Sequence, residues 1–253
     1  MFQEPEGFFP EEKQPTKASY QMMNGTKLEL RMVGFNALWG HHLWQGARRV
    51  SRYLEEHLAT FLPGKAVLEL GAGAGLPSLV CAKLGAKAVI VTDYPDADLV
   101  ENLALNVKTL SESGLPGTLH AEGFLWGADP SSLLAHIPQA TGDVNDRAFD
   151  MVLLADLLFN HSEHHALLKT VQSTLRRGEG ARALVFFSPY RPWLLQKDLA
   201  FFELAKQGGL KVTKVGEWVE EKVMFEEDRG DELLRRTVFG YELSWDDVLP
   251  QSS

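Results

Sequence analysis

Cysteine is almost absent from this chain of 253 residues, which contains only Cys81. A single cysteine cannot form an internal disulfide, and the reducing cytoplasm is the compartment that fits such a composition. The sequence also lacks any run of 18 uncharged apolar residues, and residues 1–6 are acidic without the apolar stretch of a signal peptide. We therefore expect a cytoplasmic protein with no membrane-spanning segment and no membrane partner.

Positive charge is the second scarce feature. The chain has 25 Lys and Arg residues against 34 Asp and Glu residues, which gives a net charge of −9. Binding to a nucleic-acid backbone depends on clustered Lys and Arg, so we expect no nucleic-acid partner. An acidic surface favours a basic partner, although a charge of this size is also explained by solubility alone.

Linkers rich in proline or serine are missing too, so we predict a single domain over residues 19–253. Residues 1–18 differ because Glu, Pro and Gly dominate them. This composition cannot bury enough apolar surface to order itself, and it predicts a flexible acidic N-terminal arm. We expect a monomer, although the sequence alone does not decide the oligomeric state.

What is present is an alternation of predicted strands and helices. Residues 20–32 alternate around Asn24-Gly25, which predicts a β-hairpin, and residues 44–62 have the apolar spacing of an amphipathic helix. From residue 63 onward we predict strands at 66–70, 87–92, 118–122, 149–155 and 183–188, and helices at 76–85, 96–110, 161–175 and 193–207. This order predicts an α/β fold, with a parallel sheet and helices on both faces.

Three details of the pattern are more specific. The strand at 149–155 is the most apolar, as a central strand should be. The helix at 161–175 follows Asn160, a good N-cap, and Glu163 completes a capping box. The last two predicted strands, 211–223 and 234–243, have no predicted helix between them and should form an antiparallel C-terminal hairpin.

The most informative motif follows the first strand of this series. Glu69-Leu70 ends the strand, and three glycines two residues apart come next: Gly71, Gly73 and Gly75. Asp93 lies twenty residues past Gly73, where the next strand ends. Glycine lets a backbone approach a ligand closely, and a carboxylate on the neighbouring strand can bind ribose hydroxyls. The motif predicts a nucleoside cofactor, although glycine pairs also mark plain turns.

The glycine spacing then narrows the choice of cofactor. A dinucleotide-binding loop would place its third glycine at position 76, where this chain has Leu76. With Glu69 two residues ahead of the first glycine, the loop resembles motif I of the class I S-adenosylmethionine-dependent methyltransferases.

Asp156 and Phe159 directly follow the predicted central strand, at the place where a cofactor's reactive group would lie. Methyl transfer to an amine depends mainly on positioning. A carboxylate can orient the amine and assist its deprotonation, and an aromatic face can hold it while it is cationic. These two residues are therefore the catalytic candidates. The alternative is a chance Asp-x-x-Phe sequence with Phe159 in the core.

With these residues the chain resembles the family-16 lysine methyltransferases, which carry a D/E-x-x-Y/F motif after the fourth strand. The similarity runs from residue 30 to 243, and its segments are 38–44, 71–75, 124–127, 155–161 and 187–192. Phe159 departs from the Tyr of many relatives and keeps the aromatic face without the hydroxyl. The resemblance implies a Rossmann-like seven-stranded methyltransferase sheet and S-adenosyl-L-methionine as cofactor.

The resemblance also assigns roles to residues. Asp156 and Phe159 would be catalytic. The cofactor-binding residues would be Trp44 at the methionine end, Gly71, Ala72 and Gly73 beneath the cofactor, Asp93 on the ribose, Trp126 beside the adenine and Ala155 at the base of the pocket. Both tryptophans could instead be ordinary buried aromatic residues.

The resemblance further implies a substrate. It is closest to fungal enzymes of this family that methylate the N-terminal α-amine and a nearby lysine of translation elongation factor 1-alpha. One alternative is a small-molecule amine methyltransferase of the nicotinamide type, with the 1–18 arm as a lid. A second alternative is a non-catalytic binding module, against which the intact glycines, Asp93 and Asp156 argue.

The histidines give weaker signals. His161 and His165 lie one helical turn apart, but no third ligand has suitable spacing and the reaction needs no metal, so we predict no metal site. His41-His42 and Tyr190 lie where a substrate would pass, but capping or packing explains them equally well.

Overall fold

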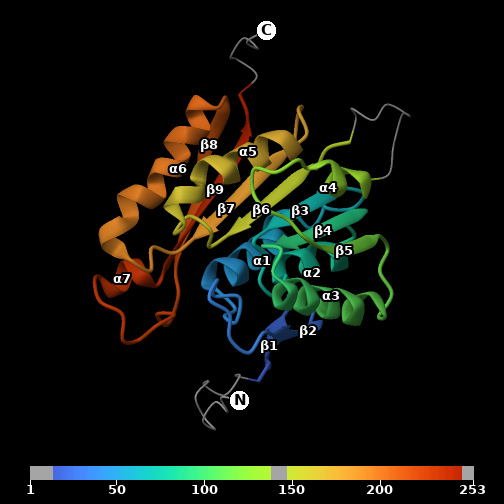
Figure 1. The fold of residues 1–253 in the computed structure, drawn as a ribbon, viewed down its shortest axis with the longest axis horizontal. Coiled ribbons are helices and arrows are strands. Elements are labelled where there is room, and N and C mark those ends of the chain that lie inside the picture. Colours follow the sequence, from blue (N-terminus) through green and yellow to red (C-terminus); the bar gives the residue numbers. More distant parts are fainter. Residues whose placement is uncertain (1–13, 138–146, 247–253) are drawn as a thin grey trace, which may run out of the picture.

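The computed structural model of the protein describes residues 14–137 and 147–246. It contains a two-stranded and a seven-stranded sheet (Figure 1). The strands are β1 (Thr16–Gln21), β2 (Lys27–Met32), β3 (Ala66–Leu70), β4 (Ala88–Asp93), β5 (Thr118–Gly123), β6 (Met151–Ala155), β7 (Arg182–Phe187), β8 (Leu210–Val219) and β9 (Thr237–Trp245). The helices are α1 (Gln45–His57), α2 (Leu76–Lys83), α3 (Ala97–Ser111), α4 (Ser131–Ala135), α5 (His164–Thr174), α6 (Leu195–Gln207) and α7 (Glu232–Arg235).

The seven-stranded sheet has the order β5-β4-β3-β6-β7-β9-β8. Strands β3 to β7 pair in parallel, and β9 lies antiparallel between β7 and β8. This confirms the predicted parallel α/β sheet and its antiparallel C-terminal hairpin. Chain order reverses direction at β3, because β4 lies on one side of it and β6 on the other. Ligands of such sheets bind beside this point, at the carboxyl ends of the strands.

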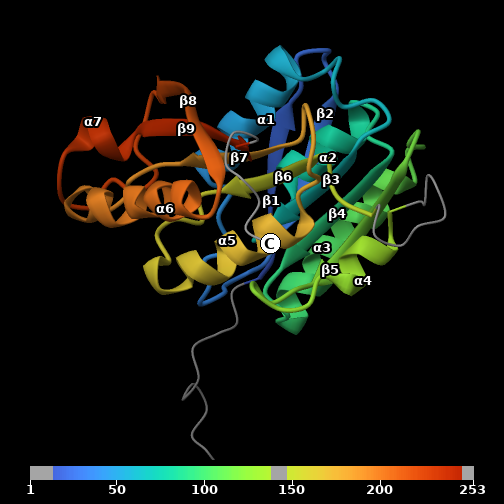
Figure 2. The ribbon, with the colours of Figure 1, turned by 90° about the horizontal axis from the view of Figure 1, so that it is seen from above.

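The burial of the central strands explains why they could be predicted from continuous apolar runs in the sequence. Every residue of β3 and β4 is buried, as expected for strands covered on both faces. Successive side chains of these strands point to opposite faces of the sheet, and a separate hydrophobic core lies on each face. One contains apolar residues of α1, α2, α3 and the hairpin β1–β2, and the other those of α4, α5 and α6. Figure 2 shows helices on both sides of the sheet, as predicted.

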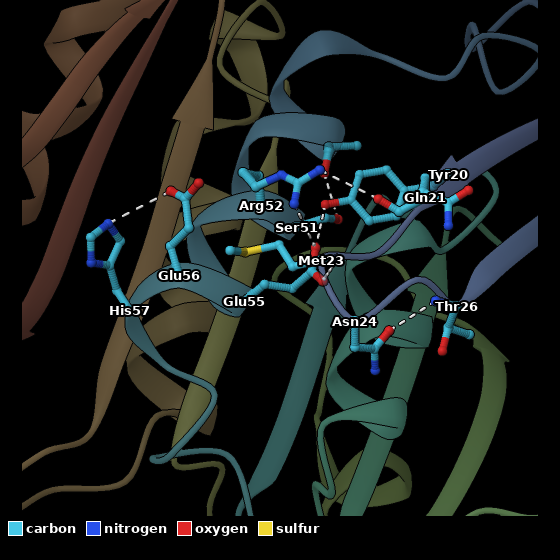
Figure 3. Close-up of polar contacts among 11 residues, drawn as sticks. Tyr20, Gln21, Met23, Asn24, Thr26, Ser51, Arg52, Glu55, Glu56 and His57 are labelled. Carbon is cyan, nitrogen blue, oxygen red and sulfur yellow. Dashed lines mark hydrogen bonds and ion pairs between the residues drawn. The ribbon is translucent and has the colours of Figure 1, made fainter.

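The N-terminal hairpin is fastened to α1 through one carboxylate. The Tyr20 hydroxyl donates to Glu55 Oε2 at 2.6 Å, and the Met23 N–H donates to Glu55 Oε1 at 2.6 Å (Figure 3). Burial and the Glu55 carboxylate raise the pKa of Tyr20, so its hydroxyl remains a donor. Near the other end of the hairpin, the Arg31 N–H donates to the buried Asn106 on α3. These contacts fix the start of the segment 33–44, which leads to α1.

Several boundaries differ from the predictions. Residues 161–175 form a 3-10 turn, His161–Glu163, followed by α5. The Asn160 side chain makes no cap hydrogen bond, and its oxygen accepts from the Ser162 hydroxyl at 3.1 Å. The short helices α4 and α7 were not predicted, and α7 interrupts the segment between β8 and β9. Most of the predicted 1–18 arm lies outside the described residues, but β1 already begins at Thr16.

The helices of the described part are short. The longest, α3, has 15 residues, whereas spanning a bilayer takes about 20. Within residues 14–137 and 147–246, no helix has the length and apolar character of a membrane span.

Candidate functional site

A cavity of about 490 Å³ opens at the carboxyl ends of β3, β4 and β6. This volume lies within the roughly 300–1,000 Å³ of small-molecule sites. All nine residues predicted from the sequence line it: Trp44, Gly71, Ala72, Gly73, Asp93, Trp126, Ala155, Asp156 and Phe159. They come from five separate segments of the chain, which the sheet topology brings to one place.

The glycine loop forms one wall of this cavity, and its backbone requires glycine. Gly71 and Gly73 have φ of 57° and 56°. A Cβ on Gly71 would lie 2.6 Å from the end of the Leu157 side chain, which would have to shift. A Cβ on Gly73 would meet only the Gly40 carbonyl, at 3.9 Å. The second glycine thus leaves room for a ligand to approach the backbone.

Asp93 joins the glycine loop to the next strand. Its Oδ2 accepts the Gly73 N–H at 2.6 Å, and its Oδ1 accepts the Tyr94 N–H at 2.7 Å. Burial raises the pKa of this carboxyl, and the two N–H donors oppose the shift. A carboxylate has about four lone-pair positions, so capacity remains for ribose hydroxyls. The ribose assignment stays a prediction.

Glu69 lies fully buried beneath the loop. Its Oε2 accepts the Ser78 N–H in the first turn of α2 at 2.8 Å, where a helix favours negative charge. Burial raises the pKa of Glu69 to about 8, and the Ser78 hydrogen bonds oppose the shift. The carboxylate therefore fastens the start of α2 to β3. Because the Ser78 N–H at the start of α2 already donates to Glu69, this N–H is not available to bind a ligand.

Asp156 occupies the opposite wall, in the left-handed conformation with φ of 56°. Its Oδ2 accepts the Gly46 N–H at 2.6 Å and its Oδ1 accepts the Ser188 N–H at 2.9 Å. The Tyr190 hydroxyl lies 3.4 Å from Oδ2. Burial raises the pKa of Asp156 to about 7, against the effect of these donors. The predicted catalytic carboxylate thus also ties the start of α1 to the end of β7.

Gly46 was missed by the sequence reasoning. A Cβ at this position would lie 2.4 Å from Asp156 Oδ2, so only glycine lets the helix start approach the carboxylate. The sequence holds no local signal for this need, because the two residues are 110 positions apart.

Aromatic rings border the same end of the cavity. Trp44 stacks on Phe159, with ring centroids 6.5 Å apart and planes inclined by 16°, and its indole N–H donates to the Trp39 carbonyl at 3.3 Å. The Tyr190 ring lies 5.0 Å from that of Trp44. Phe159 is 39% exposed, which rules out the reading of this residue as core. The rings form an open aromatic wall beside Asp156.

The histidines divide into two groups. His42 lines the cavity, and His41 packs against it with ring centroids 4.1 Å apart. His161 Nε2 instead pairs with Asp198 Oδ1 at 2.6 Å, and His164 Nε2 contacts the Leu158 carbonyl. Among the described residues, no three His, Cys, Asp or Glu side chains are grouped as metal ligands.

Solved structures share this fold. TYW2 of P. horikoshii, a structure in complex with MeSAdo, has a TM-score of 0.51 and 16% identity over 92% of this chain and 72% of its own. The T. thermophilus 16S rRNA N2 G1207 methyltransferase RsmC, in complex with AdoMet and guanosine, has a TM-score of 0.52 and 16% identity over 91% and 50%. The chain therefore has the fold of class I S-adenosylmethionine-dependent methyltransferases.

Sequence comparison identifies the family. Residues 23–207 match the family described as lysine methyltransferase, and the chain belongs to that family. Curated relatives extend over nearly the whole length. One is the protein N-terminal and lysine N-methyltransferase efm7 of Emericella nidulans, 48% identical over 98% of this chain and 96% of the relative. The protein of the same name in Schizosaccharomyces pombe is 40% identical over 96% and 94%.

The cofactor of this enzyme is S-adenosyl-L-methionine, and the residues present fit it. Gly73 leaves open space for a ligand above the loop. Asp93 and Trp126 both line the cavity; the carboxylate would accept hydrogen bonds from the ribose hydroxyls, and the ring would offer an apolar surface to the adenine. The donor therefore has a polar and an apolar contact surface within one cavity.

The first prediction concerns Asp93. Asp93→Ala should weaken binding of S-adenosylhomocysteine, measured by calorimetry, by about 1–3 kcal/mol, because charged hydrogen bonds to the ribose are lost. Asp98→Ala, which removes an exposed carboxylate at the start of α3, is the control and should leave the affinity unchanged. Equal affinity in both variants would contradict the ribose assignment.

The second prediction concerns pH and Glu69. Because burial raises its pKa to about 8, the folded protein keeps a proton that the unfolded chain releases above its ordinary value of 4.5. The contribution of Glu69 to stability is therefore full below pH 4.5 and is lost as the pH rises through about 8. Glu69→Gln keeps an acceptor for the Ser78 N–H and removes this titration.

Urea denaturation at several pH values tests this prediction. Between about pH 5 and about pH 9 the free energy of unfolding should fall more in the wild type than in Glu69→Gln. Glu101→Gln, at an exposed position of α3, should behave as the wild type does. Parallel curves for wild type and Glu69→Gln would show that the buried carboxyl does not titrate in this range.

Proposed function

We propose that this methyltransferase acts on proteins, at an N-terminal α-amine and an adjacent lysine, and that its substrate is translation elongation factor 1-alpha. The relatives align with this chain over nearly their whole length, and their names describe protein N-terminal and lysine N-methyltransferases. This supports the proposal that the substrate is a protein. The observation that carries the proposal is the composition of the cavity. A glycine loop suited to the cofactor faces a buried carboxylate, Asp156, set beside an exposed aromatic ring, Phe159.

The proposed chemistry needs little from the protein beyond placement. S-adenosyl-L-methionine supplies an electrophilic methyl group on its sulfonium. Asp156 is placed to accept a hydrogen bond from the target amine, and its raised pKa of about 7 makes it a base able to take the amine proton near neutral pH. The Trp44 and Phe159 rings hold the amine while it is cationic, since aromatic faces attract ammonium groups.

The rim of the cavity suits an extended peptide better than a small molecule. Large apolar side chains stand exposed beside the opening: Leu38 at 52%, Trp39 at 48% and Leu125 at 53%. Side chains of this kind supply apolar contacts for a bound chain. Glu163 also lines the cavity and adds negative charge, which complements a basic peptide. We place this reaction in the cytoplasm, where translation takes place.

The third prediction identifies the substrate. With labelled S-adenosyl-L-methionine, the wild type should transfer label to recombinant elongation factor 1-alpha, at its α-amine and an adjacent lysine, as located by mass spectrometry. Substrate acetylated at the N-terminus is the control, because it has no free α-amine. Rapid methylation of nicotinamide with none of the protein would move the assignment to the small-molecule class.

The fourth prediction concerns Asp156. Asp156→Ala should lower turnover per folded molecule by about 100-fold or more, the usual scale for a positioned base. It should also lower stability by about 1–3 kcal/mol, because the buried N–H groups of Gly46 and Ser188 lose their acceptor. Turnover in the wild type should rise as the pH increases through about 7, where the carboxylate form becomes populated.

Asp198→Ala is the matched control for this variant. It removes another buried aspartate, which pairs with His161 and does not line the cavity. Its stability should fall while its turnover per folded molecule stays near that of the wild type. If Asp156→Ala keeps near wild-type turnover when corrected for its folded fraction, Asp156 has only the structural role.

A further inference from the structure

The loop between β8 and β9 reaches the substrate end of the cavity from far along the chain. Its Phe225 ring lies against three rings that line the cavity, with centroid distances of 6.1 Å to Trp39, 5.1 Å to His42 and 5.7 Å to Trp44. Tyr190 lies 6.1 Å away on the same side. All four pairs meet edge to face, an arrangement that favours a defined orientation. Phe225 therefore packs edge to face against the Trp39, His42 and Trp44 rings, and the wall below refers to these three rings.

This loop is held in place by contacts on both of its sides. The Phe225 carbonyl accepts from Nη1 of the buried Arg235 at 2.8 Å. The Gln45 side-chain amide donates to the Lys222 carbonyl at 2.6 Å, and Arg49 Nη2 pairs with Glu220 at 2.6 Å. Gln45 and Arg49 belong to the first turns of α1, which begins directly after Trp44. The loop and Trp44 are thus both fixed to the N-terminal end of α1.

The loop also lies outside the region shared by the family. The family match stops at residue 207, before β8 begins. The shared region contains the glycine loop, Asp93 and Asp156, which serve the cofactor and the transfer. Within the cavity lining, the Phe225 ring of this loop contacts Trp39, His42 and Trp44. An element placed beside the substrate but outside the shared region is suited to select among substrates.

We propose that Phe225 is a specificity-determining residue that positions the Trp39, His42 and Trp44 rings as the wall for the peptide chain next to the target amine. This inference rests on the proposed function, because it assumes a protein substrate. Phe225 acts through other residues, so its loss should weaken peptide binding more than cofactor binding. A free small amine fills only the space beside Asp156 and does not reach the Trp39 and His42 rings.

The fifth prediction tests this role with Phe225→Ala in the full chain. The probe is a synthetic peptide with the N-terminal sequence of elongation factor 1-alpha, labelled at its carboxyl end and followed by fluorescence anisotropy with S-adenosylhomocysteine present. The peptide Kd and KM should rise about tenfold, because the edge-to-face contacts that hold the wall are lost. The value of kcat and the affinity for S-adenosylhomocysteine should change much less, because Trp44 is also held by its N–H bond to the Trp39 carbonyl and its contact with Phe159.

Three further variants keep the test sharp. Phe225→Tyr retains the ring and should restore peptide affinity. Leu233→Ala, which shortens an exposed apolar side chain of the same segment, should behave as the wild type does. Gln45→Leu removes the hydrogen bond to the Lys222 carbonyl without touching the rings. It should also raise the peptide Kd, and it replaces Phe225→Ala in the test if that variant does not fold.

The outcomes separate this inference from the proposed function. Unchanged peptide Kd and KM in Phe225→Ala, or an equal loss of cofactor affinity, would overturn the positioning role while leaving protein methylation in place. A wild type that neither binds nor methylates the peptide would overturn the proposed function and this inference with it.

Discussion

The hydrogen bonds of one buried carboxylate, that of Asp156, join the start of α1 to the end of β7 beside the cavity. Asp156 accepts the Gly46 N–H from α1 and the Ser188 N–H after β7. A buried charge is costly unless donors surround it, so each donor must stay in place for the carboxylate to be tolerated. The position of α1, and of Trp44 just before it, therefore depends on this residue. The aromatic wall and the loop fastened to α1 follow from the same constraint.

The same device occurs at three neighbouring strands. Glu69 at β3, Asp93 at β4 and Asp156 after β6 are all buried. Each accepts a backbone N–H from a neighbouring segment, from Ser78 in α2, Gly73 in the glycine loop and Gly46 in α1, respectively. Burial raises the pKa of all three carboxyl groups. The cavity is thus framed by acids that order irregular backbone. Such backbone cannot use sheet hydrogen bonds, so side chains must supply its partners.

Local patterns predicted the frame of this protein well. Strand β3 was predicted at residues 66–70, its observed bounds, because a fully buried strand is a continuous apolar run ended by glycine. The glycine loop and Asp93 could be found because their spacing follows one strand-turn-helix unit. The 3-10 turn after Asn160 could not be predicted, since the residues Asn160 to Glu163 have the pattern of a capping box and the Asn160 oxygen instead accepts from Ser162. Gly46 and Phe225 were missed because their partners lie far away in the sequence.

The placement of β9 has a consequence for how the chain is made. Strand β7 pairs with β9, although β8 is synthesised first. During synthesis the edge of β7 therefore stays unpaired until residues 237–245 have left the ribosome. An exposed apolar strand edge of this kind invites pairing with other chains. The nascent protein therefore exposes the edge of β7 until β9 is complete, and binding of a chaperone would protect that edge in the interval.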